Sequence, residues 1–252
     1  RQRQMCIRDR CYNVRCFEYR IKKRLMSLII ERHQYKNLSR TSLDGKRVYK
    51  CPDGEAVASV TTILDSTKDK THLFEWRKRV GEENAKRITK EASGMGTRMH
   101  KYIENYINNA TWDTPGSNPY SQQAFKMAQT VYDNALKDVN EIWGSEVSLY
   151  FPKIYAGTTD CVGEYKGAPC IIDFKQTNKP KKKEWIEDYF LQLVAYAEAH
   201  NEVYGTKINE GHVFMCARDL TYQQFDITPL NYAKYKDLWW QRVEEYYIKY
   251  AH

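Results

Sequence analysis

The chain has 252 residues and a net charge of +8, and 42% of its residues are hydrophobic, which suits one domain with a substantial core. No apolar run approaches the roughly 20 residues that a membrane-spanning helix needs, so we expect a soluble protein with no membrane partner.

The positive charge is concentrated at the N-terminus. Residues 1–25 hold nine Lys or Arg and two Asp or Glu, a net +7, which leaves the rest of the chain at only +1. Basic composition is therefore weak evidence for nucleic-acid binding.

We interpret residues 1–25 as a sequence artefact or disordered tail, because MCIRDR resembles sequencing-adapter read-through. An Arg-rich transit peptide is the alternative. Residues 26–252 are predicted to form a single domain.

The first half of the chain is predicted to be mainly helical. Residues 33–60 contain short β-prone runs around an Asp-Gly turn. A charged helical stretch follows over residues 73–92, and residues 94–109 carry apolar side chains at helical spacing. Ser121 to Asn140 has the pattern of another amphipathic helix.

The second half is predicted to form a sheet with helices. Alternation in EVSLYF indicates a strand that starts at Glu146, and further strands follow near residues 154–162 and 170–176. A long helix is expected from about Glu184 to Tyr204. Two more strands (212–217 and 223–227) and a last helix after Pro229 complete the chain. The core order is therefore α-β-β-β-α-β, which is typical of an α/β fold with a mixed central β-sheet flanked by helices.

Two acids and a lysine are concentrated in the strand pair around the turn at Gly163 to Pro169. Asp160 lies in the first strand, and the run CIIDFKQ carries Asp173 and Lys175 in the second. Side chains two apart on a strand share a face, so Asp173 and Lys175 point the same way. Two carboxylates that hold a hard cation, with a lysine beside the attacking water, are the minimum equipment of a metal-dependent phosphodiester hydrolase.

An ordered series of motifs accompanies this pair. GTRMH contains His100, SEVSLYF contains Glu146, and QLVAY contains Gln192 and Tyr196. The series G-T-x-x-H, E, G-x-x-D, D-x-K, Q-x-x-x-Y resembles the RecB-type branch of the PD-(D/E)xK nuclease superfamily, which includes phage-encoded exonucleases and mitochondrial genome maintenance exonucleases. The resemblance covers roughly residues 60–204. One departure is Thr159, which stands before Asp160 in place of proline.

The resemblance implies a restriction-endonuclease-like core and assigns roles within it. Asp160 and Asp173 would bind Mg²⁺, with Mn²⁺ as a substitute, and the main-chain carbonyl of Phe174 would complete the inner shell. Glu146 would be a third acid, although a simple strand-edge charge is the alternative. His100 would approach the metal or the scissile phosphate. Lys175 would orient or deprotonate the attacking water and stabilise the charge that develops on phosphorus.

A second group of residues is expected to hold the nucleic acid. Gln192 and Tyr196 lie four apart, so they share a helix face and could hold a phosphate or stack on a base; a core-facing tyrosine is the alternative. The basic run after the D-x-K strand could contact phosphates and an unpaired base, or be a solvated loop. It contains Lys179, Lys181, Lys182, Lys183 and Trp185.

The resemblance implies a magnesium-dependent DNA exonuclease that acts from ends, prefers single-stranded DNA and serves DNA repair, recombination or phage DNA metabolism. A structure- or site-specific endonuclease of the same fold and a catalytically dead nucleic-acid-binding module are the alternatives. We expect an intracellular, cytoplasmic protein of a bacterium or a phage-infected cell. The oligomeric state and the cleavage polarity stay open.

Overall fold

The computed structural model describes residues 29–43 and 45–250. The interpretation of residues 1–25 as a tail lies outside this range. Among the described residues, no helix is long and apolar enough to cross a membrane.

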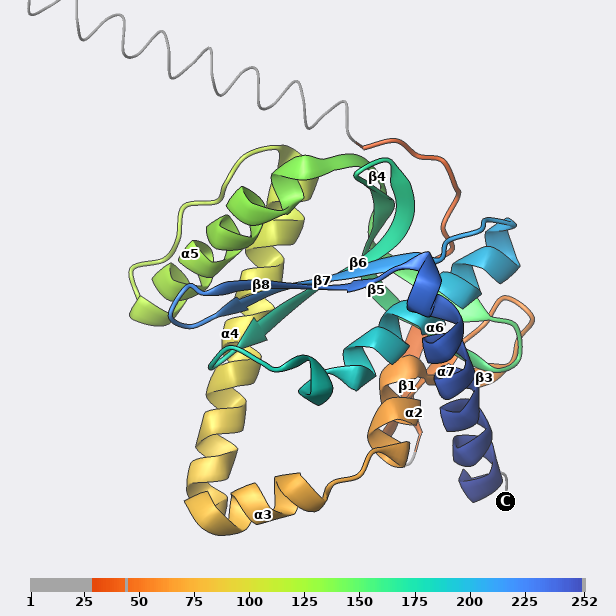
Figure 1. Ribbon diagram of the computed structural model, residues 1–252, viewed down its shortest axis with the longest axis horizontal. Coiled ribbons are helices and arrows are strands. Elements are labelled where there is room, and N and C mark those ends of the chain that lie inside the picture. The colour runs from red at the N-terminus through yellow and green to blue at the C-terminus, as the bar shows by residue number, and fades with distance from the viewer. Residues whose placement is uncertain (1–28, 44, 251–252) are drawn as a thin grey trace, which may run out of the picture.

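The elements follow the predicted order, with a strand-rich start and a helical section before the main sheet (Figure 1). The strands are β1 (Ser39–Leu43), β2 (Lys46–Lys50), β3 (Ala56–Ser59), β4 (Val139–Phe151), β5 (Tyr155–Tyr165), β6 (Ala168–Thr177), β7 (Glu210–Ala217) and β8 (Tyr222–Ile227). The helices are α2 (Val60–Thr67), α3 (Thr71–Val80), α4 (Glu82–Asn109), α5 (Pro119–Asn134), α6 (Glu187–Tyr204) and α7 (Pro229–Tyr250), with short 3₁₀ turns at Leu136–Asp138 and Lys183–Trp185.

The strands form one mixed sheet in the order β1-β2-β3-β5-β6-β7-β8, with β4 paired to β5. The β3–β5 and β6–β7 pairs are parallel, and the other pairs are antiparallel. The α-β-β-β-α-β core order and the mixed sheet with flanking helices are therefore confirmed.

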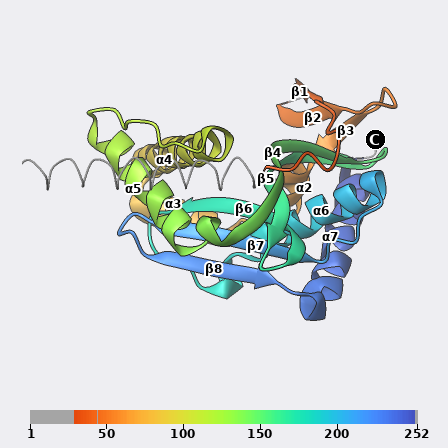
Figure 2. The ribbon, with the colours of Figure 1, turned by 90° about the horizontal axis from the view of Figure 1, so that it is seen from above.

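Helices cover both faces of the sheet (Figure 2). One apolar cluster joins α4 and α5 to alternate residues of β6, namely Cys170, Ile172 and Phe174. A second cluster joins α2, α6 and α7 to the opposite face, which includes Ile171. Both faces of β6 are buried, which explains its continuous apolar run, as expected for a central strand.

One edge of β5 is left partly open, and this positions the site. β4 pairs along β5 on one side, from Tyr155 to Tyr165. On the other side β3 pairs only with residues 155–156 and β6 only with residues 161–165. Residues 157–160 therefore form a gap in the ladder between β3 and β6, and Asp160 lies in that gap.

Several predicted boundaries were wrong. The strand of Glu146 begins at Val139, so Glu146 lies inside the strand, and the helix predicted to reach Asn140 ends at Asn134. Apolar residues continue across this junction, so their spacing alone did not separate helix from strand. Residues 82–109 form one continuous helix, and α6 begins at Glu187 after a 3₁₀ turn.

A buried histidine ties the segment before β1 to α6. The His200 side chain is inaccessible to solvent, its Nε2 lies 3.0 Å from the Tyr35 hydroxyl, and its Nδ1 lies 2.8 Å from Thr206 Oγ1. A neutral imidazole satisfies both contacts, donating through one nitrogen and accepting through the other. Burial lowers the pKa of His200 to about 3 from an ordinary value of 6.5.

This histidine predicts an acid-sensitive fold. Between the two pKa values the unfolded chain binds a proton that the folded chain does not, so the free energy of unfolding should fall as the pH falls from about 6.5 toward 3. The slope from this group is at most about 1.4 kcal/mol per pH unit. Denaturant unfolding at several pH values should show a shallower slope for His200→Gln than for the exposed control His72→Gln. Equal slopes in the two variants would contradict this assignment.

Candidate functional site

Asp160 occupies the gap in the ladder beside β6. Its Oδ2 accepts a hydrogen bond of 2.7 Å from the main-chain N–H of Phe174, two residues beyond Ile172, where the β5–β6 pairing ends. The carboxylate thus replaces a missing strand partner, which satisfies a main-chain donor and fixes the orientation of the acid.

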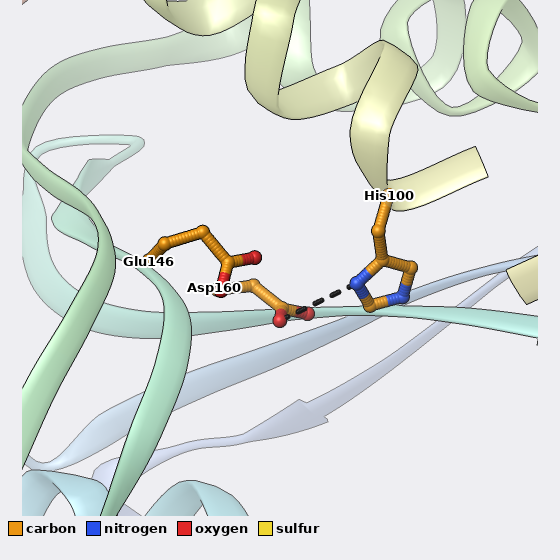
Figure 3. Close-up of side chains that lie close together, drawn as sticks. All are labelled: His100, Glu146 and Asp160. Carbon is orange, nitrogen blue, oxygen red and sulfur yellow. Dashed lines mark ion pairs between the residues drawn. The ribbon is translucent and has the colours of Figure 1, made fainter. Parts of the chain in front are cut away.

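Three potential metal ligands converge at this point (Figure 3). One ligand atom from each of His100, Glu146 and Asp160 lies within 4.8 Å of the others. His100 projects from α4, and its Nδ1 lies 3.5 Å from Asp160 Oδ1. Glu146 projects from β4, opposite Asp160 in the strand register. The sequence-predicted residues His100, Glu146 and Asp160 are therefore neighbours in space.

Glu146 reaches the cluster through an unusual backbone conformation. Its φ is +52°, in the left-handed region, and it interrupts the pairs that β4 makes with β5 on either side, Ser145–Cys161 and Val147–Thr159. A residue other than glycine pays about 1–2 kcal/mol in this region. Such strain next to converging acids is typical of a functional position.

Asp173 and Lys175 form an ion pair beside this cluster. Asp173 is 1% exposed, and its Oδ2 contacts Lys175 Nζ. The Lys175 ammonium also lies 5.1 Å from the centre of the Tyr189 ring of α6. Asp173 is not one of the three residues in the close ligand group. The predicted pair of Asp160 and Asp173 is linked instead through the main chain, because Asp160 accepts its hydrogen bond from Phe174, the residue after Asp173.

Burial and a neighbouring acid raise the pKa values of two of the acids. Burial raises the pKa of Glu146 to about 7, and the Asp160 carboxylate adds to that rise. Glu146 is exposed as a residue, but its carboxylate is directed toward the cluster. Burial also raises the pKa of Asp173 to about 6, with Lys175 opposing the rise and Asp160 adding to it. Both shifts indicate a site that a positive ion would stabilise.

The remaining groups favour their charged forms. Burial would raise the pKa of Asp160, but the nearby His100 and Lys175 outweigh it and the pKa is lowered. Burial would lower the pKa values of His100 and Lys175, but neighbouring aspartates outweigh it in both cases and raise them. The site therefore holds closely coupled charges of both signs.

Two clefts meet at His100. A cleft of about 740 Å³ contains the cluster, and a second cleft of about 480 Å³ contains Lys175. Gly96 and His100 line both, so this stretch of α4 forms their common wall. Sequence reasoning assigned no role to most other lining residues. Thr97 and Gln176 lie within the quoted runs GTRMH and CIIDFKQ, whereas others lie outside every motif; these include Arg40, Arg47 and Lys101 in the first cleft and Trp76 and Ile88 in the second.

Gln192 and Tyr196 lie under the sheet on α6. Gln192 Nε2 donates to the Tyr196 hydroxyl over 3.4 Å, which agrees with their predicted common face. Tyr196 is only 2% exposed, and a Cβ at Gly157 would lie 2.9 Å from its ring. The ring is thus packed against β5 and offers no free face to a base in this structure.

The predicted basic run forms the exposed loop between β6 and α6. Trp185 is 63% exposed, and Lys182 lies 5.6 Å from its ring centre. The Lys181 main-chain N–H donates to Gln223 of β8 over 2.7 Å, which anchors the loop. Lys179 and Lys183 are exposed. The loop follows Asn178, which lines the cleft of Lys175, but the structure does not bring these lysines into the ligand cluster.

Proteins named as exonucleases are similar to this chain. Mitochondrial genome maintenance exonuclease 1 from Homo sapiens is 29% identical over 206 residues, which cover 75% of this chain and 58% of that protein. The Xenopus tropicalis protein is 27% identical over 209 residues and the Mus musculus protein 28% over 204, covering 75% and 76% of this chain and 57% and 59% of those proteins. The chain is homologous to these exonucleases and spans somewhat less than three fifths of their length.

Other comparisons add less. No family model matches the chain. A solved structure from Eubacterium rectale, named as a candidate exonuclease, is 15% identical and superimposes with a TM-score of 0.45 over 62% of this chain and 64% of that one. A likeness at this level carries no argument here.

The expected location was wrong. We predicted a cytoplasmic protein of a bacterium or phage-infected cell, whereas the curated relatives come from animals and are named for mitochondrial genome maintenance. The motif series resembles a branch that includes both phage-encoded and mitochondrial exonucleases, so the resemblance did not separate the two sources.

The strain at Glu146 predicts a gain in stability on substitution. Glu146→Gly should raise the free energy of unfolding by about 0.5–1 kcal/mol, since glycine adopts a positive φ without strain but loses more chain entropy on folding. Lys166→Gly, also at φ +52° but in the β5–β6 turn, is the matched control. Denaturant unfolding should show a gain in both variants, while only Glu146→Gly should lose stabilisation by Mn²⁺. A less stable Glu146→Gly beside a more stable Lys166→Gly would contradict the strain argument.

Proposed function

We propose that the chain is a divalent-metal-dependent DNA exonuclease of the RecB-type PD-(D/E)xK branch, which prefers single-stranded ends and serves mitochondrial genome maintenance. The observation that carries this proposal is the convergence of His100, Glu146 and Asp160 in a cleft beside the Asp173–Lys175 pair. Homology to named exonucleases supports the reaction class. Their names are also the support for the mitochondrial setting.

The residues present suit a hard divalent cation. Asp160, Glu146 and Asp173 offer carboxylate oxygens. Burial, with the Asp160 charge adding to it, raises the pKa values of Glu146 and Asp173, and a bound cation would favour their charged forms. Oxygen donors with one imidazole are compatible with Mg²⁺ or Mn²⁺. In this proposal those acids hold the ion together with His100 and the Phe174 carbonyl. A bound ion would supply positive charge to the phosphate during hydrolysis.

Lys175 is suited to orient water and offset negative charge. Its ammonium is fixed between the Asp173 carboxylate and the Tyr189 ring and lines the cleft that meets the cluster at His100. A fixed ammonium stabilises charge that develops on phosphorus better than a mobile one, because no reorganisation is needed during the reaction. His100, held against Asp160, is suited to contact the scissile phosphate.

The residues that the sequence predicted to contact DNA differ in their exposure to solvent. The exposed loop of Lys179, Lys181, Lys182, Lys183 and Trp185 is suited to guide a strand toward the Lys175 cleft. Gln192 and the buried Tyr196 are suited to position the active-site strands rather than to stack on a base. Residues 26–252 are proposed to act as one nuclease domain.

Mode of attack can be tested with single-stranded DNA of one sequence in linear and closed circular forms. With Mg²⁺ the linear form should be degraded progressively while circles persist, because an exonuclease needs an end. Addition of EDTA should stop degradation. The Lys175→Ala variant should degrade the linear strand about 10²–10⁴-fold more slowly. The same variant is the control for a contaminating nuclease.

Two results would contradict the proposal. Equal cleavage of circles and linear strands would favour an endonuclease of the same fold. Binding of DNA without cleavage of either form, in Mg²⁺ or Mn²⁺, would favour a nucleic-acid-binding module with an inactive site.

A further inference from the structure

The β1–β2 hairpin contributes two arginines to the cleft that contains the ligand cluster. Arg40 of β1 and Arg47 of β2 line the same cleft of about 740 Å³ as His100, Glu146 and Asp160. They lie more than 50 residues before His100 in the chain, outside every motif of the sequence analysis. The fold alone therefore brings them to the site.

The strand register explains how the hairpin presents both arginines on one face. Arg40 pairs with Tyr49, and Ser42 pairs with Arg47, so these four side chains share a face of the hairpin. Tyr49 is buried, and its hydroxyl lies 3.3 Å from Thr158 Oγ1. Thr158 belongs to the open stretch of β5, two residues before Asp160. The arginine-bearing face is thereby anchored beside the gap in the ladder.

The two guanidinium groups differ from the neighbouring lysines in their partners. Both arginines are exposed, and no carboxylate oxygen of the described residues lies within 4.0 Å of either. Lys101 in the same cleft is already paired with Glu104 at 3.2 Å. Arg40 and Arg47 also line an adjoining hollow of about 450 Å³ together with Thr41, Ser42 and Gly45. Side chains that can donate hydrogen bonds, together with small residues, therefore line the surface from the ligand cluster into this adjoining hollow.

Charge and shape indicate what this surface binds. Glu146, Asp160 and Glu104 make the same cleft unfavourable for a free anion. A DNA strand with its reacting phosphate at the cluster would place further phosphates nearby, and those need positive charge that is not already paired. Guanidinium forks suit phosphate oxygens, since they form two parallel hydrogen bonds.

We propose that Arg40 and Arg47 bind successive phosphates of the DNA strand, on the side of His100 that faces away from Lys175. The common wall at Gly96 and His100 divides the Lys175 cleft from the arginine cleft. The strand therefore continues past the reacting phosphate and leaves along the β1–β2 hairpin. This proposal rests on the proposed nuclease function and adds a binding subsite to it.

Binding without cleavage separates the two proposals. The probe is fluorescein-labelled oligothymidylate of about 16 nucleotides, at the upper end of single-strand site sizes. Its affinity for the full chain would be measured by fluorescence anisotropy in EDTA across a salt series. The variants are Arg40→Gln/Arg47→Gln, the charge-conserving Arg40→Lys/Arg47→Lys, and Lys50→Gln. Lys50 is an exposed residue on the opposite face of β2 and is the matched control.

The double glutamine variant should bind the oligonucleotide at least about 10-fold more weakly at low salt. Its slope of log K against log salt should be shallower by about 1.4, which is the value for the loss of two phosphate contacts with a single strand. The double lysine variant should recover most of the slope, and Lys50→Gln should match the wild type. A double glutamine variant that matches Lys50→Gln, beside a wild type that binds, would overturn the subsite and leave the nuclease proposal standing. A wild type that neither binds nor cleaves DNA would overturn both.

Discussion

The site depends on one hydrogen bond, from the Phe174 N–H to the Asp160 carboxylate. β5 and β6 pair only as far as Cys161 and Ile172, and a strand end that opens inside a sheet leaves a main-chain donor without a partner. Asp160 supplies that partner with one oxygen and directs the other toward His100. Asp160 therefore completes the end of the strand pairing with one oxygen and faces the ligand cluster with the other.

Irregular backbone concentrates around this bond. Along β5, Tyr155 packs in the cluster beneath α6, while Cys161, six residues later, packs beneath α4 and α5. Regular alternation would place both on one face, so the faces exchange within the open stretch. Directly opposite, Glu146 adopts its left-handed conformation. Two well-packed apolar clusters on either side of the sheet offset the cost of this distortion and hold it in place.

Sequence patterns predicted what regular structure determines. Alternation placed Asp173 and Lys175 on one face, where they form an ion pair, and helical spacing placed Gln192 beside Tyr196. The patterns failed where the backbone is irregular or the contact is remote. Glu146 was assigned to a strand start because regular alternation begins there, and its positive φ leaves no mark in a single sequence. Arg40 and Arg47 were missed because only the pairing of β3 with β5 brings their hairpin to the cluster.

Direct measurement of metal binding tests the central claim, that the acids at the opening between β5 and β6, Asp173 among them, bind a divalent cation. Mn²⁺ titration calorimetry would compare the wild type with Asp173→Asn and with Asp226→Asn, whose carboxylate instead pairs with His212 at 2.8 Å. The account predicts at least about a 10-fold loss of affinity for Asp173→Asn, since an amide is a poorer ligand for a hard cation, and unchanged affinity for Asp226→Asn. Equal Mn²⁺ affinity in all three proteins would contradict it.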